Sequence, residues 1–124
     1  MLSPMSADDC PVKFTADVIG GKWKPLILYF LKEGARRPAE LQRSIIAISR
    51  KMLTQQLREL EQDGIVERRD YGEIPLRVEY AMTVKGASLK PILELMANWG
   101  MHYRSHKTTE AEDAGLRENS PSEH

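Results

Sequence analysis

The chain has 124 residues, 41% of them hydrophobic and 29% charged, which is the composition of an ordinary globular protein. This length fits one compact domain that folds without disulfides or a structural metal. No apolar run reaches the ~18 residues that a membrane span needs, and the N-terminus lacks the features of a secretory signal. A single cysteine excludes an internal disulfide and a cysteine-rich metal site, and it favours a cytoplasmic protein.

The formal net charge of zero hides an uneven distribution of charge. Residues 10–107 carry 17 basic and 11 acidic side chains, a net charge of +6, whereas both ends of the chain are acidic. Within this stretch, residues 36–51 hold five basic residues against Glu40 alone. A basic middle favours a polyanion as partner. We expect a flexible segment over residues 1–9, one folded domain over 10–107 and a disordered acidic tail over 108–124.

The spacing of apolar residues predicts three short helices in the first third of the chain. The first begins after Cys10 and ends at Gly20, because a proline follows the cysteine and suits the first turn of a helix. The second begins near Trp23, and Gly34 suits the position after its end. A third short helix is predicted over residues 38–45.

A fourth helix is predicted from Ser49, a suitable N-cap, to about Asp63. Its residues Leu53, Leu57 and Leu60 follow helical spacing and form one buried face. A tight connection joins the third helix to the fourth. Together the two helices have the layout of a helix-turn-helix.

Two strand-like runs follow, residues 65–70 and 76–82, and a five-residue tip joins them into a hairpin. In the second run, Val78, Tyr80 and Met82 alternate with other residues, which is the pattern of a half-buried strand. This hairpin would be the wing of a winged helix-turn-helix. The predicted fold class is therefore mainly α with a small β-hairpin.

A last helix is predicted up to about Arg104. Thr83 could cap its start, but Pro91 would then lie in its interior, so we expect either a kink or a later start near Ser88. Its apolar stripe is broader than the about three core-facing positions that such a domain needs. We therefore expect a homodimer through the terminal helices. The residues expected in the dimer interface are Leu89, Ile92, Leu93, Met96 and Trp99.

The outward face of the fourth helix has the chemistry of DNA recognition. Lys51, Gln55 and Arg58 lie opposite its leucines, at about 100° per residue. Such side chains suit base edges and phosphates, although any amphipathic helix has a polar side. Combined with the turn, the wing and the local charge, they predict double-stranded DNA as partner, with Gln55 and Arg58 in the major groove. The candidate DNA-binding residues are Arg37, Ser49, Arg50, Lys51, Thr54, Gln55, Arg58, Arg68 and Arg77.

Four segments of the chain also resemble the HxlR family of bacterial winged helix-turn-helix regulators. These segments are residues 10–12, 19–23, 48–60 and 78–86, and the match extends to residue 104 through Leu89, Pro91, Trp99 and Gly100. Pro38 departs from the family pattern, in which an aromatic residue often stands at this place. The resemblance implies a DNA-binding transcriptional regulator that works as a homodimer.

Cys10 is a candidate sensor of oxidants or electrophiles. It lies at a predicted helix start, where the helix dipole and Lys13 favour a thiolate, whereas Asp8 and Asp9 oppose one. Several HxlR regulators use a cysteine at this position for sensing, so the resemblance implies the same role here. With no second cysteine, the subunit could respond by an intersubunit disulfide, an adduct or overoxidation. The alternative is a thiol that only packs or caps.

Two other classes of function compete with DNA binding. An enzyme is disfavoured, because the chain has no glycine-rich phosphate loop and its three histidines all lie near the C-terminus. His102 and His106 are four residues apart, but no acid or cysteine stands at matching spacing, so we predict no metal and no cofactor. The second competitor is a winged helix that contacts only other proteins, which would not need basic residues clustered on one helix. The sequence indicates no small-molecule effector.

Overall fold

The computed structural model describes the backbone of residues 3–117 and the side chains of residues 3–104. Its contacts divide the chain into two compact units, residues 1–90 and 91–124, where the sequence predicted one domain over 10–107. Within the described residues, no helix combines the length and the apolar character that a membrane span requires.

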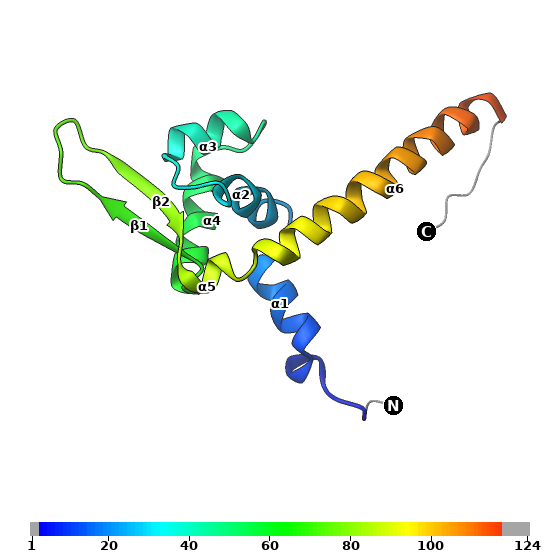
Figure 1. The fold of residues 1–124 in the computed structure, drawn as a ribbon, viewed down its shortest axis with the longest axis horizontal. Helices are drawn as coiled ribbons and strands as arrows, with labels where there is room; N and C mark the ends of the chain where they lie inside the picture. Colours follow the sequence, from blue (N-terminus) through cyan, green and yellow to red (C-terminus); the bar gives the residue numbers. More distant parts are fainter. Residues whose placement is uncertain (1–2, 118–124) are drawn as a thin grey trace. The chain divides into compact units, whose positions relative to one another are not determined.

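The described residues of the first unit form a 3-10 turn, five helices and a two-stranded antiparallel sheet (Figure 1). This content confirms the predicted class, mainly α with a small β-hairpin. In chain order the elements of the first unit are η1 (Ala7–Asp9), α1 (Pro11–Ile19), α2 (Lys24–Leu31), α3 (Pro38–Ser44), α4 (Arg50–Gln62), β1 (Val66–Asp70), β2 (Val78–Met82) and α5 (Val84–Ala87). A long helix, α6 (Lys90–Arg117), begins at the last residue of this unit.

The core of the first unit lies between α2, α3, α4 and the base of the hairpin. In α4, Leu53, Leu57 and Leu60 are each at most 2% exposed, as their spacing predicted. The strand side of the core is closed by Ile65 and Val66, which are equally buried. This apolar contact determines which side of α4 faces solvent.

Capping interactions define both ends of α4. The Ser49 hydroxyl accepts a hydrogen bond from the Met52 amide at 3.0 Å, which confirms Ser49 as the N-cap. Gly64 ends the helix in the left-handed region, with φ +74°.

The connection before α4 includes Ala47 at φ +78°, a conformation that alanine adopts only under strain. The predicted tight turn between α3 and α4 is therefore present.

The hairpin is shorter in its strands and longer in its tip than expected. Residues 71–77 connect β1 to β2, whereas a five-residue tip was predicted. The alternation in β2 was also misread: Ala81 is its buried residue, while Val78 and Tyr80 are half-buried. Ala81 is buried because the end of α2 packs on that side of β2. On the other edge, the backbone of Arg36 exchanges two hydrogen bonds with Tyr80, at 2.8 and 2.9 Å.

The helical conformation is interrupted between α5 and α6. Of the two arrangements expected around Pro91, a kinked helix or a later helix start, the structure has the later start. The Thr83 hydroxyl accepts a hydrogen bond from the Gly86 amide at 3.0 Å and caps only the short α5. A new helix then begins at Lys90, so that Pro91 lies in its first turn, where a missing N–H costs nothing. The backbone of α6 is helical as far as Arg117, beyond the predicted domain end at residue 107, and residues 118–124 lie outside the described part.

Gly86 allows α5 to pack closely against the start of the hairpin. A Cβ atom at this position would stand 2.0 Å from the Ile65 carbonyl oxygen. We expect Gly86→Ala to lower the free energy of unfolding by about 1–3 kcal/mol, because the backbone must shift to admit the methyl group. Urea denaturation measures the change. The control, Val84→Ala, alters a side chain that is 93% exposed and should stay within about 0.5 kcal/mol of the parent. Equal urea midpoints for Gly86→Ala and the parent would contradict this contact.

Candidate nucleic-acid interface

The outward face of α4 presents the predicted recognition side chains. Lys51, Thr54, Gln55 and Arg58 are all exposed, opposite the buried leucines. Arg50 is exposed at the first residue of the helix, where the free N–H groups concentrate partial positive charge. The structure therefore brings these residues together on one accessible face.

The basic side chains of this region are not neutralised within the subunit. Across the described side chains, Arg43, Arg50, Lys51 and Arg58 form no ion pair and no side-chain hydrogen bond. Arg43 extends the cationic region onto α3, and sequence reasoning did not include it among the candidates. Four exposed and unpaired cations on two adjoining helices form a surface that attracts phosphate.

Two further candidates, Arg37 and Ser49, stand immediately before α3 and α4. Arg37 is exposed, and its backbone amide donates to the Glu40 carboxylate at 2.7 Å, which secures the start of α3. Ser49 is exposed as well, although its hydroxyl already accepts the capping bond from Met52. A hydroxyl keeps a donor when it accepts one bond, so Ser49 can still donate to a phosphate.

The acidic end of α4 is linked to α2 by an ion pair. The Lys24 ammonium lies 2.7 Å from a Glu59 carboxylate oxygen, and the Gln55 amide nitrogen donates to the other oxygen at 3.4 Å. The hydrogen bond from Lys24, and then that from Gln55, lowers the pKa of Glu59 below its usual value. Because a carboxylate only accepts, the bond from Gln55 turns its amide nitrogen toward Glu59 and leaves its carbonyl oxygen for a donor.

Sequence reasoning identified Gln55 but missed the two residues that orient it. The spacing of Gln55 and Glu59, four residues apart, could have indicated their contact. No sequence signal connects Lys24 with Glu59, since the two belong to different helices.

The arginines of the hairpin are engaged by acids of the hairpin itself. Arg68 lies 3.6 Å from Asp70, and Arg69 donates to Glu67 at 2.7 Å. Arg77 stacks on the ring of Tyr71, with the guanidinium carbon 4.1 Å from the ring centroid. Arg77 also lies 3.9 Å from Glu73, and the Tyr71 hydroxyl donates to Glu79 at 3.0 Å. The hairpin therefore presents Arg68 and Arg77 with their charge partly neutralised, unlike the cations of α3 and α4.

Cys10 lies at the N-cap position of α1, as predicted. Its side chain makes no capping hydrogen bond, and the thiol is free and half-buried. Lys13, which was expected to favour a thiolate, pairs instead with Asp17 at 2.7 Å. The positive charge near Cys10 is thus smaller than the sequence suggested.

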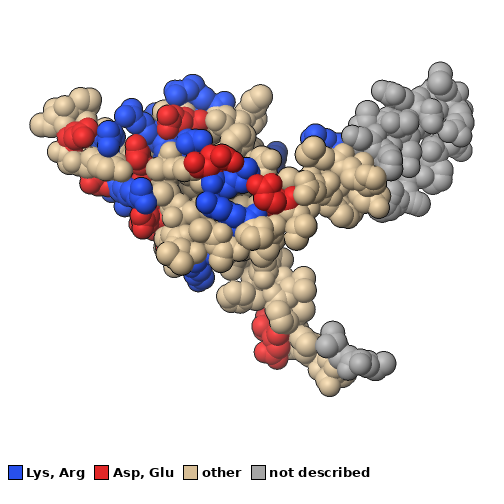
Figure 2. Space-filling model, in the orientation of Figure 1, with Lys and Arg blue, Asp and Glu red and all other residues tan. Residues whose placement is uncertain are grey.

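The described part of α6 has a wide apolar surface. Among the predicted interface residues, only Leu93 is buried and Leu89 is half-buried, while Ile92, Met96 and Trp99 are exposed, Trp99 to 65%. Three more apolar residues on this helix, Leu95, Met101 and Tyr103, are also exposed. Figure 2 shows acids and bases interspersed over the first unit, whereas the described part of α6 is mostly uncharged.

Within the described side chains, no group of three or more histidine, cysteine or acidic residues is arranged to hold a metal ion. His102 packs edge-on against Tyr103, with 4.6 Å between the ring centroids. His106, the other residue of the pair considered above, lies outside the described side chains.

Comparison with known proteins decides the family. Residues 18–108 match the sequence pattern of the HxlR-like helix-turn-helix. The chain belongs to the HxlR family of winged helix-turn-helix transcriptional regulators. It is 48% identical over 108 residues to the HTH-type transcriptional regulator YkvN of Bacillus subtilis (strain 168), covering 87% of this chain and 92% of that protein.

Solved structures show the same relationship. The redox regulator HypR in its reduced form has a TM-score of 0.77 and 46% identity to this HxlR-type chain, covering 81% of this chain and 99% of that one. HypR in its oxidized form has a TM-score of 0.73 and 49% identity, covering 75% of this chain and 96% of that one. Both matches confirm the winged-helix architecture.

The pairing of Lys24 with Glu59 can be measured directly. In Lys24→Met we expect the pKa of the Glu59 carboxyl to rise toward its ordinary value, since the bond from Lys24 is the main cause of its lowering. Because the folded-state pKa is depressed, the pair stabilises the fold above the unfolded pKa, and this stabilisation is lost as pH falls through the folded value. A carbon-13 NMR titration of the side-chain carboxyl reports the change, with Lys22→Met as control. A Glu59 pKa that is equal in Lys24→Met and the parent would exclude the ion pair.

Proposed function

We propose that this HxlR-type regulator binds an inverted-repeat operator in double-stranded DNA as a homodimer, in the cytoplasm, and has no enzymatic activity. The observation that carries the proposal is the group of exposed, unpaired cations formed by Arg43 on α3 and by Arg50, Lys51 and Arg58 on α4. A recognition helix contacts bases with its N-terminal residues, and the acids of α4 stand at its other end.

The face of α4 divides into two kinds of contact. Arg50, Lys51 and Thr54 stand near the helix start and suit the phosphate backbone. Gln55 and Arg58 stand further along the outward face and suit base edges in the major groove. Gln55 keeps its carbonyl oxygen and one N–H, because the bond to Glu59 uses only one of the two N–H groups of the amide, so a base that presents an exocyclic amine beside an acceptor is its expected partner.

Substitutions on α4 should separate these two kinds of contact. We expect Gln55→Ala or Arg58→Ala to cost about 1–3 kcal/mol of operator binding and to relax sequence preference, because base contacts are lost. Lys51→Ala should weaken binding to all sequences alike and lower the salt slope by about one, because a phosphate contact is lost.

Bound fragments selected from random DNA supply the operator, and fluorescence anisotropy at several salt concentrations measures both effects. Lys22→Ala, which removes an exposed positive charge outside α3 and α4, serves as the matched control. If Gln55→Ala and Arg58→Ala bind with the affinity and specificity of the parent, this recognition face is wrong. If the parent protein shows no salt-dependent duplex binding, a module for protein contacts takes the place of the proposed function.

The apolar surface of α6 supports assembly into a dimer. Exposed apolar area of this extent is uncommon on a monomer and is removed from water when two copies pair. In a two-fold dimer the two α4 helices would enter successive major grooves, about 34 Å apart. The proposed interface comprises Leu89, Ile92, Met96 and Trp99, whereas Leu93, also expected there from the sequence, is buried in the single subunit and has no surface to offer a second copy.

A charged substitution on α6 tests the dimer. We expect Trp99→Glu to shift the protein from dimer to monomer at micromolar concentration, since a carboxylate would be buried in an apolar interface. Asn98→Glu, an exposed neighbour on the same helix, should leave the dimer intact. Light scattering coupled to size exclusion gives the mass of each variant. A monomeric mass for the unmodified protein would overturn the proposed assembly.

We further propose that Cys10 makes DNA binding responsive to oxidants or electrophiles. Support comes from the half-buried free thiol at the start of α1 and from the likeness to HypR, a redox regulator with oxidized and reduced structures. A reaction at this thiol would change the N-cap of α1 and could reach α4 through the dimer.

The response of operator binding to diamide tests this role. We expect diamide to change the operator affinity of the parent and to leave that of Cys10→Ser unchanged, because Cys10 is the single cysteine of the chain. Anisotropy before and after treatment, followed by reduction with dithiothreitol, measures the effect and its reversal. The same response in both proteins, or none in either, would remove Cys10 as the sensor.

A further inference from the structure

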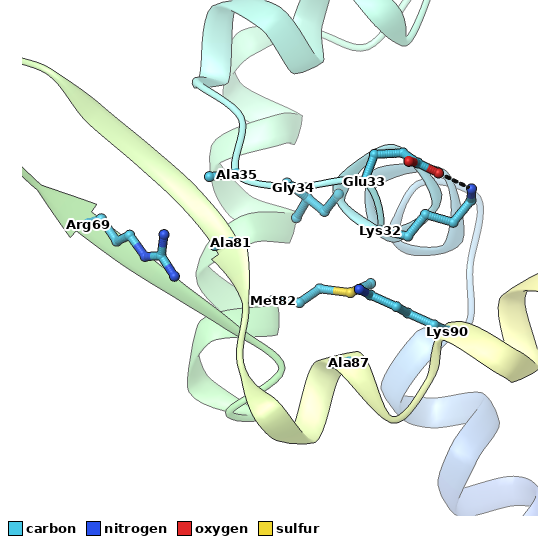
Figure 3. Close-up of a pocket in the computed structure, with 10 residues that line it drawn as sticks. Lys32, Glu33, Gly34, Ala35, Arg69, Ala81, Met82, Ala87 and Lys90 are labelled. Atoms are coloured by element: carbon cyan, nitrogen blue, oxygen red, sulfur yellow. Dashed lines mark hydrogen bonds and ion pairs between the residues drawn. The ribbon is translucent and has the colours of Figure 1, made fainter.

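A pocket of about 270 Å³ opens where the end of α2 meets β2 and α5 (Figure 3). Its apolar wall is formed by Leu31, Ala81, Met82 and Ala87. Pockets for drug-sized ligands have volumes of about 300 Å³ or more. This pocket is slightly smaller, so it fits a small molecule. Neither Cys10 nor the outward face of α4 contributes to this pocket.

Charged side chains surround the apolar wall, and most of them are cations. Lys32, Arg69 and Lys90 line the pocket together with one acid, Glu33. The pKa of Glu33 is lowered, mainly by its hydrogen bond and charge interaction with Lys32 and to a smaller extent by the charges of Arg36 and Lys90. The surroundings of the pocket are therefore electropositive, which favours an anionic ligand.

The three cations differ in what they can offer to a ligand. Lys32 is held by Glu33 at 2.8 Å and lies over the ring of Tyr29. Arg69 donates to Glu67 through Nε, and a guanidinium has further N–H groups. Lys90 forms no ion pair with any described residue.

Lys90 and Arg69 line different parts of the pocket. In Figure 3 the side chain of Lys90 extends toward Met82, and that of Arg69 extends from β1 toward Ala81. Lys90, which forms no ion pair with any described residue, is the cation best placed to bind an added carboxylate.

We propose that this pocket binds a small organic carboxylate with an apolar body. The carboxylate group pairs with Lys90, and the apolar body lies against Leu31, Met82 and Ala87. An inorganic anion would leave the apolar wall uncovered, and a neutral apolar molecule would leave Lys90 without an anionic partner. An occupant would contact both the end of α2 and Lys90, the first residue of α6.

Benzoate, its neutral analogue benzamide, and acetate are the probes that test this site. We expect benzoate to bind the full-length, DNA-free protein saturably with a Kd of about 1 mM, the range for so small a ligand. Benzamide should bind about tenfold more weakly or worse, because it lacks the charge, and acetate should be weaker too, because it lacks the apolar body. Protein-detected NMR titration gives the three affinities and the residues whose signals shift.

Substitutions around the pocket locate the binding. Lys90→Met should weaken benzoate binding about tenfold, the effect of losing one charge-assisted hydrogen bond. Ala87→Leu should weaken it as well by filling the pocket, and its NMR spectrum shows whether the fold is intact. Lys22→Met, which removes a positive charge outside the pocket, is the matched control and should bind benzoate like the parent.

Three results would overturn the proposal. The first is equal affinity for benzoate and benzamide, and the second is the absence of saturation up to about 20 mM benzoate. The third is unchanged benzoate affinity in both Lys90→Met and Ala87→Leu. Because these titrations contain no DNA, their outcome is independent of whether the protein binds an operator.

Discussion

The burial of three leucines on α4 is the contact on which the rest of the functional surface depends. Leu53, Leu57 and Leu60 pack into the core, and their removal from water contributes about 1.5–3 kcal/mol each to folding. A helix with one side held in this way has no rotational freedom about its axis. The basic and amide side chains on the opposite side are consequently exposed together, and the caps at Ser49 and Gly64 limit them to a helix of defined length.

Charge pairing inside the subunit determines where a polyanion can bind. Basic residues occur along the whole first unit, but those of the hairpin have acidic partners nearby, and Lys24 is paired with Glu59. Exposed ion pairs of this kind add little to stability, yet they lower the local positive potential. Among the described side chains, Arg43 of α3 and Arg50, Lys51 and Arg58 of α4 form a group of cations without an ion-pair partner. The net charge of the chain is zero, and it does not indicate which basic residues have an ion-pair partner and which do not.

Two non-helical residues separate α5 from α6, so the last helix begins independently of α5. Thr83 caps a short helix, Gly86 lets that helix approach Ile65, and Pro91 fits the first turn of the next. The ligand pocket that we propose lies beside this break, and Lys90 belongs to both the pocket and α6. A single short segment therefore connects the winged-helix unit, the pocket and the helix that carries the apolar surface.

The sequence by itself determined the helices, their caps and the outward face of α4, because these features depend on neighbours within about four residues. It also indicated the winged-helix order and the apolar stripe of α6. Only the tertiary structure brought Lys24 to Glu59 and Arg77 onto the ring of Tyr71, since these pairs meet by folding and not by local spacing. The same holds for the buried side of β2, where the packing of α2 on Ala81 outweighed the alternation of larger residues, and for the pocket beside it. Local periodicity specifies what each element exposes, whereas long-range packing specifies which exposed groups stay available to a ligand.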